Sequence, residues 1–331
     1  MKALAACTLV AGVSLAAFAI PGRGGSTGAS GNVTVTLVAE PAAVQPGRPF
    51  HVGVRMKMRD GWHTYWKNPG DAGLPLQIVW RLPEGSRAGP IEWPVPERMP
   101  AGPVMSYGYE REVLLPIEIT PPDRIEGDSM TIEGVLDWLE CKDVCLPGSA
   151  VLDLRLPVRS GPPSPGPAAA LFVEARSRMP RTPDGWSLSA EAGPRAISLA
   201  ARAPSGFSAQ GGYLFLDQPL VADFGIPQGF ERTKDGYRLT MTPAPNAPRP
   251  PARLTGVLVF DEPAGAGGPA ALQIDVPVTQ GDPAPAPGQS ERAGLPKAAY
   301  AAIIGLFALG VALLLRIAAR GRTAGNQDRN R

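Results

Sequence analysis

Apolar and polar residues alternate in two short segments near the start of the chain, at 32–41 and 50–58. Such a period of two is typical of a strand with one face in a core and the other in water. Further apolar segments follow at 76–82, 112–119, 130–140 and 149–157. Turn-forming clusters at 59–61, 68–71 and 82–85 separate several of them. This arrangement predicts a β-sandwich over residues 32–158, with the aromatic cluster at 62–66 on a turn.

A second series of short apolar segments follows a proline-rich stretch at 160–167, SGPPSPGP. Proline has no amide donor and fixes φ, so this stretch predicts a domain boundary. The second series predicts strands at 186–190, 196–201, 212–217, 237–241, 253–260 and 271–278. We expect a second β-sandwich domain at 168–280, which a short helix at 168–178 would open. It contains no cysteine and no histidine, which favours a structural spacer or a docking module.

Both ends of the chain carry long apolar runs. Lys2, the apolar run at 3–20 and the small-residue triplet at 17–19 predict a signal peptide at 1–19. The uncharged run at 298–315 has the length of a transmembrane helix. We expect a proline-rich spacer at 281–297 before it and a basic cytoplasmic tail at 316–331 after it. Because the arginines follow the span, the body of the protein should lie outside the cytoplasm.

Composition narrows the possible chemistry. The formal net charge is only +2, which gives no electrostatic reason to expect a nucleic-acid partner. The chain has 39 glycines and 39 prolines among 331 residues, which favours a turn-rich β protein. With two histidines in the whole chain, a multi-histidine metal site is not expected. The sequence predicts neither a resident metal nor a cofactor.

Cysteines carry the main chemical signal. Cys7 leaves with the predicted signal peptide, so the mature chain holds only Cys141 and Cys145. In an oxidising compartment such a pair tends to form a disulfide. The bridge would close a loop of only three residues and would constrain the unfolded chain little, which favours redox chemistry over stabilisation. A short structural bridge is one alternative; another is a Cu(I) site, to which His63 and methionines would contribute.

The residues around this pair form several blocks in a fixed order. The blocks are GWHTYWKNPGDAGLP at 61–75, GPIEWPVPER at 89–98, YGY at 107–109 and DWLECKDVCLPG at 137–148. Over 32–158 this series resembles the N-terminal periplasmic domain of the thiol:disulfide interchange protein DsbD, in the version found in the suppressor-of-copper-sensitivity protein ScsB. Residues 168–280 more loosely resemble the second extracytoplasmic domain of ScsB.

The resemblance implies a fold and a set of site residues. The fold would be all-β, with two immunoglobulin-like β-sandwich domains followed by a single C-terminal transmembrane helix. Cys141 and Cys145 would be the redox pair, in which Cys145 forms mixed disulfides and Cys141 resolves them. An aromatic side chain of the region 105–109 would cap the pair, with Tyr107 as the best candidate and Tyr109 beside it. Ordinary sandwich packing is the alternative for both tyrosines. His63 is either a proton relay or a structural residue.

The resemblance also implies a function at the inner membrane, with the bulk of this single-pass protein in the periplasm. The domain would be part of a protein-disulfide reductase: it would take electrons from a separate membrane protein of DsbD or ScsB type and pass them to periplasmic thioredoxin-like proteins. Cytochrome c maturation is one expected use of these electrons. A copper-binding or copper-tolerance module and a non-enzymatic docking adaptor are the alternatives.

Overall fold

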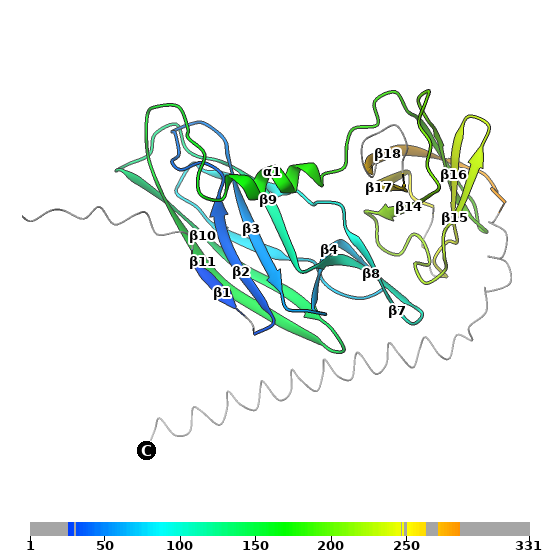
Figure 1. The fold of residues 1–331 in the computed structure, drawn as a ribbon, viewed down its shortest axis with the longest axis horizontal. Coiled ribbons are helices and arrows are strands. Elements are labelled where there is room, and N and C mark those ends of the chain that lie inside the picture. Colours follow the sequence, from blue (N-terminus) through cyan, green and yellow to red (C-terminus); the bar gives the residue numbers. More distant parts are fainter. Residues whose placement is uncertain (1–25, 30, 246, 248–249, 263–270, 285–331) are drawn as a thin grey trace, which may run out of the picture.

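The protein consists of strands, one helix and their connections in the computed structural model, which describes residues 26–29, 31–245, 247, 250–262 and 271–284. The predicted signal peptide, transmembrane helix and basic tail lie outside these residues. Among the residues that are described, no helix is both long enough and apolar enough to cross a bilayer. The predicted all-β class is confirmed, and Figure 1 shows two β domains joined by the helix α1.

Two sheets pack face to face in the first domain. One has the strand order β1-β2-β3-β9-β6, and the other has the order β11-β10-β4-β8-β7 with β5 paired to β10. Their bounds are β1 (Thr27–Ala29), β2 (Val33–Ala39), β3 (Phe50–Met58), β4 (His63–Gly70), β5 (Gln77–Arg81), β6 (Arg87–Ile91), β7 (Glu97–Ala101), β8 (Val104–Glu110), β9 (Glu112–Thr120), β10 (Ser129–Cys141) and β11 (Cys145–Pro157).

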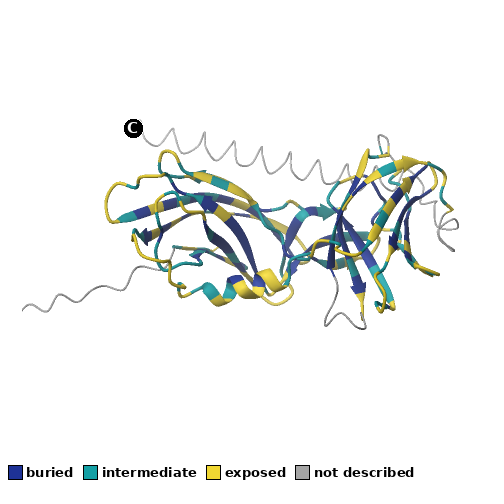
Figure 2. Ribbon diagram, turned by 90° about the horizontal axis from the view of Figure 1, so that it is seen from above, coloured by how far each residue is buried: buried dark blue, intermediate teal, exposed yellow. Residues whose placement is uncertain are grey.

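The alternation seen in the sequence accounts for the core between these sheets. In β2, Val33, Val35 and Leu37 are buried, while the side chains between them are partly or fully exposed. In β10, Ile132 and Leu136 are completely buried on the opposing sheet. Each strand thus contributes one apolar face, and burial of these faces is the main force that holds the two sheets together. Figure 2 shows the buried residues along the inner faces.

A long hairpin runs the length of the second sheet. Strands β10 and β11 stay in register from Ser129 opposite Pro157 to Cys141 opposite Cys145. The sequence predicted the second arm only from residue 149, because Pro147 and Gly148 are uncommon inside strands. Pro147 is tolerated because β11 is the edge strand of its sheet and needs no partner on its outer side.

Strand β4 lies where the sequence predicted turns. The aromatic residues at 63–66 and the residues Asn68-Pro69-Gly70 belong to one strand, so the prediction of turns at these positions was wrong; Trp62 directly precedes the strand. The strand pairs regularly with β8 up to Tyr65 opposite Gly108, and pairs again only at Gly70 opposite Ser106. Between these two pairs the chain advances by five residues along β4 but by only two residues along β8. This large bulge accommodates residues that favour turns.

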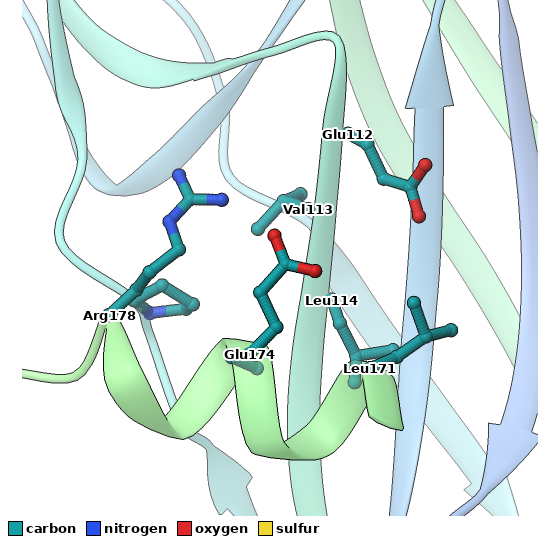
Figure 3. Close-up of a pocket in the computed structure, with 8 residues that line it drawn as sticks. Glu112, Val113, Leu114, Leu171, Glu174 and Arg178 are labelled. Carbon is teal, nitrogen blue, oxygen red and sulfur yellow. The ribbon is translucent and has the colours of Figure 1, made fainter. Parts of the chain in front are cut away.

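The helix α1 (Ala169–Ser177) packs against the first domain, not the second. Phe172 is fully buried in a small cluster with Leu114 of β9. Arg176 forms a two-pronged ion pair with Glu40, at the end of β2. Figure 3 shows the cleft between α1 and β9, with Glu174 and Arg178 at its mouth; its volume is about 20 Å³. Such a space has room for about one water molecule.

The second domain is a single continuous sheet that folds over its own core. Its strands follow the order β14-β17-β18-β12-β13-β16-β15, in which only β12 and β18 pair in parallel. Their bounds are β12 (Ser187–Ala192), β13 (Ile197–Arg202), β14 (Gly211–Leu216), β15 (Gly229–Thr233), β16 (Gly236–Met241), β17 (Arg253–Asp261) and β18 (Ala271–Gln280). Strands β4, β8 and β7 form the end of the first domain that faces this second domain (Figure 1).

Candidate redox site

Cys141 and Cys145 form a disulfide at the tip of the β10–β11 hairpin. Their sulfur atoms are 2.01 Å apart and their Cα atoms 4.2 Å apart. The two cysteines are cross-strand partners, and only residues 142–144 connect them. Cys141 is 2% exposed, whereas Cys145 belongs to the exposed residues. An incoming thiolate can therefore reach Cys145 far more readily than Cys141, and exchange requires such access.

Polar contacts below the disulfide hold the hairpin tip in place. Trp138 lies across Gly148 of the opposite strand, where an added Cβ atom would be 2.2 Å from the indole. The indole nitrogen of Trp138 donates to one carboxylate oxygen of Glu140, at 3.1 Å, and Asn32 donates to the other, at 3.0 Å. Glu140 is fully buried directly before Cys141. These bonds satisfy a buried carboxylate and tie the hairpin to the start of β2.

Tyr65 is the residue whose hydroxyl contacts the disulfide. Its oxygen lies 3.6 Å from the Sγ atom of Cys145, and its side chain is nearly buried. Gly73, at φ +119°, lies against the ring, and a Cβ atom there would be 2.2 Å from it. Burial raises the pKa of Tyr65 to about 12. The hydroxyl thus keeps its proton at neutral pH and can donate it in a hydrogen bond to a thiolate of Cys145.

His63 lies beside the buried cysteine. It is the cross-strand partner of Cys141, and its ring meets the ring of Tyr65 edge to face, with centroids 5.2 Å apart. Burial lowers the pKa of His63 below its usual value, and the nearby carboxylate of Glu110 opposes this shift only in part. His63 is therefore a neutral base at neutral pH. The structure brings this predicted site residue to the redox pair.

The charged residues of the hairpin turn are exposed. Lys142 extends back over Gly61, where a Cβ atom would be 3.0 Å from the lysine Cε atom. Asp143 is exposed beside it, so a cation and an anion both flank the disulfide. In the described part of the chain, no group of three or more histidine, cysteine, aspartate or glutamate side chains could hold a metal ion.

Tyr107 and Tyr109 lie away from the positions expected of a cap. The hydroxyl of Tyr107 is 2.7 Å from that of Tyr213 in the second domain, and its ring packs edge to face on Phe215. Tyr109 is 1% exposed and donates a hydrogen bond to the backbone oxygen of Pro94. The prediction of Tyr107 as the cap is thus corrected: Tyr65 contacts the disulfide, and Tyr107 belongs to the contact between the domains. The sequence held a signal for Tyr65, because it lies two residues after His63 and so shares its strand face.

Large apolar side chains are exposed around the disulfide. Val144 and Leu146, on either side of Cys145 in the chain, are 60% and 41% exposed. Leu74, which follows the glycine that touches Tyr65, is also exposed, at 63%. We call Val144 and Leu146, the chain neighbours of Cys145, the apolar rim. Exposed apolar groups gathered at one place mark a surface on which another protein can dock.

Fold and site together define an all-β module with an accessible disulfide at a hairpin tip, which is the class of thiol:disulfide interchange modules. Comparison with protein families supports this class. Residues 34–157 match the family described as the N-terminal domain of the thiol:disulfide interchange protein DsbD. These residues therefore form a DsbD-like N-terminal domain, as the sequence blocks predicted, and such a domain interacts with thiol-redox partners.

Solved structures give a second comparison. The N-terminal periplasmic domain of ScsB from Proteus mirabilis has 21% sequence identity to this chain and a TM-score of 0.57. The alignment covers 76% of this chain and 95% of that one, so the likeness of fold extends over both domains. The periplasmic chaperone SfaE also aligns, with 12% identity over 75% of this chain and 100% of the other, but its TM-score of 0.21 supports no argument. No curated protein matches the chain.

Proposed function

We propose that this protein is a membrane-anchored periplasmic module that relays reducing equivalents from a membrane partner to oxidised periplasmic proteins. The observation that carries the proposal is the asymmetry of the disulfide, with Cys145 exposed and Cys141 buried beneath it. The anchor rests on the apolar run at 298–315, and the compartment rests on the apolar start of the chain. We also propose that both β domains are immunoglobulin-like sandwiches.

In the first half of the relay, a reduced dithiol protein reduces the disulfide of the module. Its thiolate attacks Sγ of Cys145, the Cys141–Cys145 bond breaks, and Cys141 leaves as a thiolate. The second thiol of the donor loses its proton and attacks the donor sulfur of the mixed disulfide, which releases Cys145. The donor thereby becomes a disulfide, and the module keeps two electrons on its two sulfur atoms. The one proton that the second donor thiol gives up can protonate one of the two thiolates, and His63, a neutral base beside Cys141, is placed to take up and return this proton.

In the second half, the module reduces its acceptor. The Cys145 thiolate attacks the disulfide of an oxidised thioredoxin-like protein, forms a mixed disulfide and expels one acceptor thiolate. Cys141 then attacks Cys145, which restores the internal bond and releases the second acceptor thiol. The hydroxyl of Tyr65 would stabilise the Cys145 thiolate between the two halves, because hydrogen bonds to charged acceptors are stronger than neutral ones. Use of these electrons in cytochrome c maturation is a further expectation.

The apolar rim supports docking of a folded partner. Val144 and Leu146 expose apolar surface on either side of Cys145 in the chain, next to the sulfur that must be attacked. An acceptor with a thioredoxin-like fold would cover this surface while its own cysteine approaches Cys145. Binding and exchange would thus use one surface.

The test is the rate of exchange with a dithiol protein. We expect a reduced thioredoxin-like protein to reduce the Cys141–Cys145 bond of the full chain within seconds to minutes, and the reduced chain to pass the electrons to a second oxidised protein. Conversion of both cysteines to serine should abolish transfer without change of fold. A bond that resists the dithiol protein, although a small reductant opens it, would refute the proposal.

A further inference from the structure

The strand that carries Tyr65 also contacts the second domain. The three residues that follow Tyr65 on β4 are Trp66, Lys67 and Asn68, and each contacts the region 215–218. This region ends strand β14 and begins the connection after it. One short piece of β4 thus meets the redox disulfide at one end and the second domain at the other.

These contacts are specific and largely buried. Trp66 is fully buried and packs edge to face on Phe215, with ring centroids 6.2 Å apart. Lys67 lies over the Trp66 ring and forms an ion pair with Asp217 at 2.7 Å. Asn68 is 1% exposed and donates to the backbone oxygens of Leu216 and Gln218, at 2.8 and 3.3 Å. Without the second domain the two N–H groups of this amide would lose both carbonyl partners.

The first domain alone holds this piece of β4 weakly. Between Tyr65 and Gly70 the ladder with β8 is interrupted, so residues 66–69 lack the regular pairing that fixes a strand. Tyr107 lies opposite the bulge, and its hydroxyl and ring also face the second domain, toward Tyr213 and Phe215. The second domain therefore supplies the contacts that sheet pairing would supply in a regular strand.

Asn68 also connects the second domain to the segment behind Tyr65. Its side-chain oxygen accepts a hydrogen bond from the backbone of Gly70, at 3.2 Å. The chain then continues to Gly73, which lies against the Tyr65 ring. Ser106 of β8 fixes this segment through a hydrogen bond to the backbone oxygen of Ala72. The segment that reaches the Tyr65 ring at Gly73 is thus connected to the second domain through Asn68 and Gly70.

We propose that the second domain is a positioning element of the redox site: it holds the bulge of β4 and so keeps the Tyr65 hydroxyl at the Sγ atom of Cys145. The inference rests on the proposed function, since it gives the cysteine-free domain a task in that chemistry. The second domain affects the reactivity of a thiol that it does not touch. Tyr65 acts on the sulfur, and Asn68 and Phe215 are positioning residues that act through it.

The test compares variants of the full chain in a Cys141→Ala background, in which Cys145 is the only cysteine among the described residues. The rate of Cys145 alkylation as a function of pH gives the apparent pKa of its thiol. Asn68→Ala removes the bonds to the second domain, and Phe215→Leu removes the ring contact from the other side while retaining apolar volume. The control is Arg98→Ala. Arg98 lies on β7 and contacts the Tyr213 ring of the second domain, so its replacement removes a contact between the domains that does not involve β4.

We expect Asn68→Ala and Phe215→Leu to raise the apparent thiol pKa in the same direction as Tyr65→Phe, by up to about one pH unit. Alkylation at pH 7 should slow by up to about tenfold, because only the thiolate reacts. Asn68→Ala should add nothing once Tyr65 is phenylalanine, and Arg98→Ala should match the parent. The other titratable groups at or next to the hairpin tip are unchanged in every variant: His63, Glu110, Glu140, Lys142 and Asp143.

Two results would overturn the inference. If Tyr65→Phe shifts the profile and neither Asn68→Ala nor Phe215→Leu does, the second domain does not position Tyr65. If Tyr65→Phe leaves the apparent pKa of the Cys145 thiol unchanged, the Tyr65 hydroxyl does not act on the thiol, and positioning of Tyr65 by the second domain would have no consequence. Failure of the proposed function would be seen in a different measurement, the exchange assay, in which the parent chain would not react with a dithiol protein. Either positioning variant suffices if the other does not fold, as far-ultraviolet circular dichroism will show.

Discussion

The hydroxyl oxygen of Tyr65 lies 3.6 Å from the Sγ atom of Cys145, although the two residues are 80 positions apart in the chain. The contact joins strand β4 to the tip of the β10–β11 hairpin. It places a hydrogen-bond donor on the sulfur that is open to a partner. The chemistry of the site should therefore respond to this hydroxyl more than to either tyrosine of the segment 105–109.

Tyr65→Phe should make Cys145 less acidic. Loss of a hydrogen bond to the thiolate should raise the apparent thiol pKa by about one unit. Because the pKa of Tyr65 is raised to about 12, the parent hydroxyl stays protonated, and the difference should persist throughout the neutral range. Alkylation rates between pH 6 and 10 measure this shift. Tyr109→Phe, which removes a buried hydroxyl bonded to Pro94, is the control and should leave the thiol pKa unchanged.

The apolar rim should determine how well an acceptor docks. Val144→Ser and Leu146→Ser should each raise the KM for an oxidised thioredoxin-like protein several-fold to about tenfold, since each removes apolar area from the contact. Reduction by a small dithiol should change little. Val151→Ser changes a valine of β11 that is 59% exposed, six residues beyond Cys145, and should behave as the parent. Equal effects of the three substitutions would show that the rim is not the docking surface.

Glu140 should support the hairpin through its hydrogen bonds. Glu140→Gln places an amide where the carboxylate accepts bonds from Trp138 and Asn32, so at least one donor loses its acceptor. We expect the free energy of unfolding of the oxidised protein to fall by about 1–3 kcal/mol. Chemical denaturation measures the change. Asp137→Asn, at an exposed position on the same strand, should remain within about 0.5 kcal/mol of the parent.

His63 should make stability depend on pH. Its pKa is lowered in the folded protein, so below the ordinary value of 6.5 the unfolded chain binds this proton more readily than the folded one. The contribution is complete above pH 6.5 and is lost as the pH falls from there toward the lowered folded value. Thermal melting of the parent and of His63→Gln between pH 7.5 and 5 should show a shallower decline for the variant. Parallel curves would mean that burial does not disfavour the charged imidazole.

Sequence patterns predicted the framework of the first domain because its core strands alternate regularly. The segments at 32–41, 50–58 and 112–119 correspond to β2, β3 and β9. The cysteine pair was evident because two cysteines so close together can bond across a tight turn. The bulged end of β4 was not predictable, since Asn68, Pro69 and Gly70 favour turns. They remain in a strand because the second domain satisfies Asn68, and its carbonyl partners lie 148 and 150 residues away.

The roles of the tyrosines depended on contacts between distant segments. Resemblance assigned the cap to Tyr107, but the partners of that ring, Tyr213 and Phe215, lie in the domain where the resemblance is looser. The helix at 168–178 was predicted to open the second domain. It docks on the first because Phe172 finds a buried place beside Leu114. Sequence pattern indicates which face of an element is apolar, but not which neighbour will cover it.

The most direct test of the account is the capture of a mixed disulfide. In Cys141→Ala the thiol of Cys145 can attack an oxidised thioredoxin-like protein, but the described chain then has no second thiol that could complete the reduction of the acceptor. Cys145→Ala leaves, among the described residues, only the buried thiol of Cys141. After incubation with the oxidised partner, non-reducing electrophoresis and mass spectrometry should reveal a stable covalent complex through Cys145 in the first variant and little or none in the second. Equal trapping by both variants, or trapping only through Cys141, would contradict the central claim that Cys145 is the sulfur through which this protein exchanges electrons.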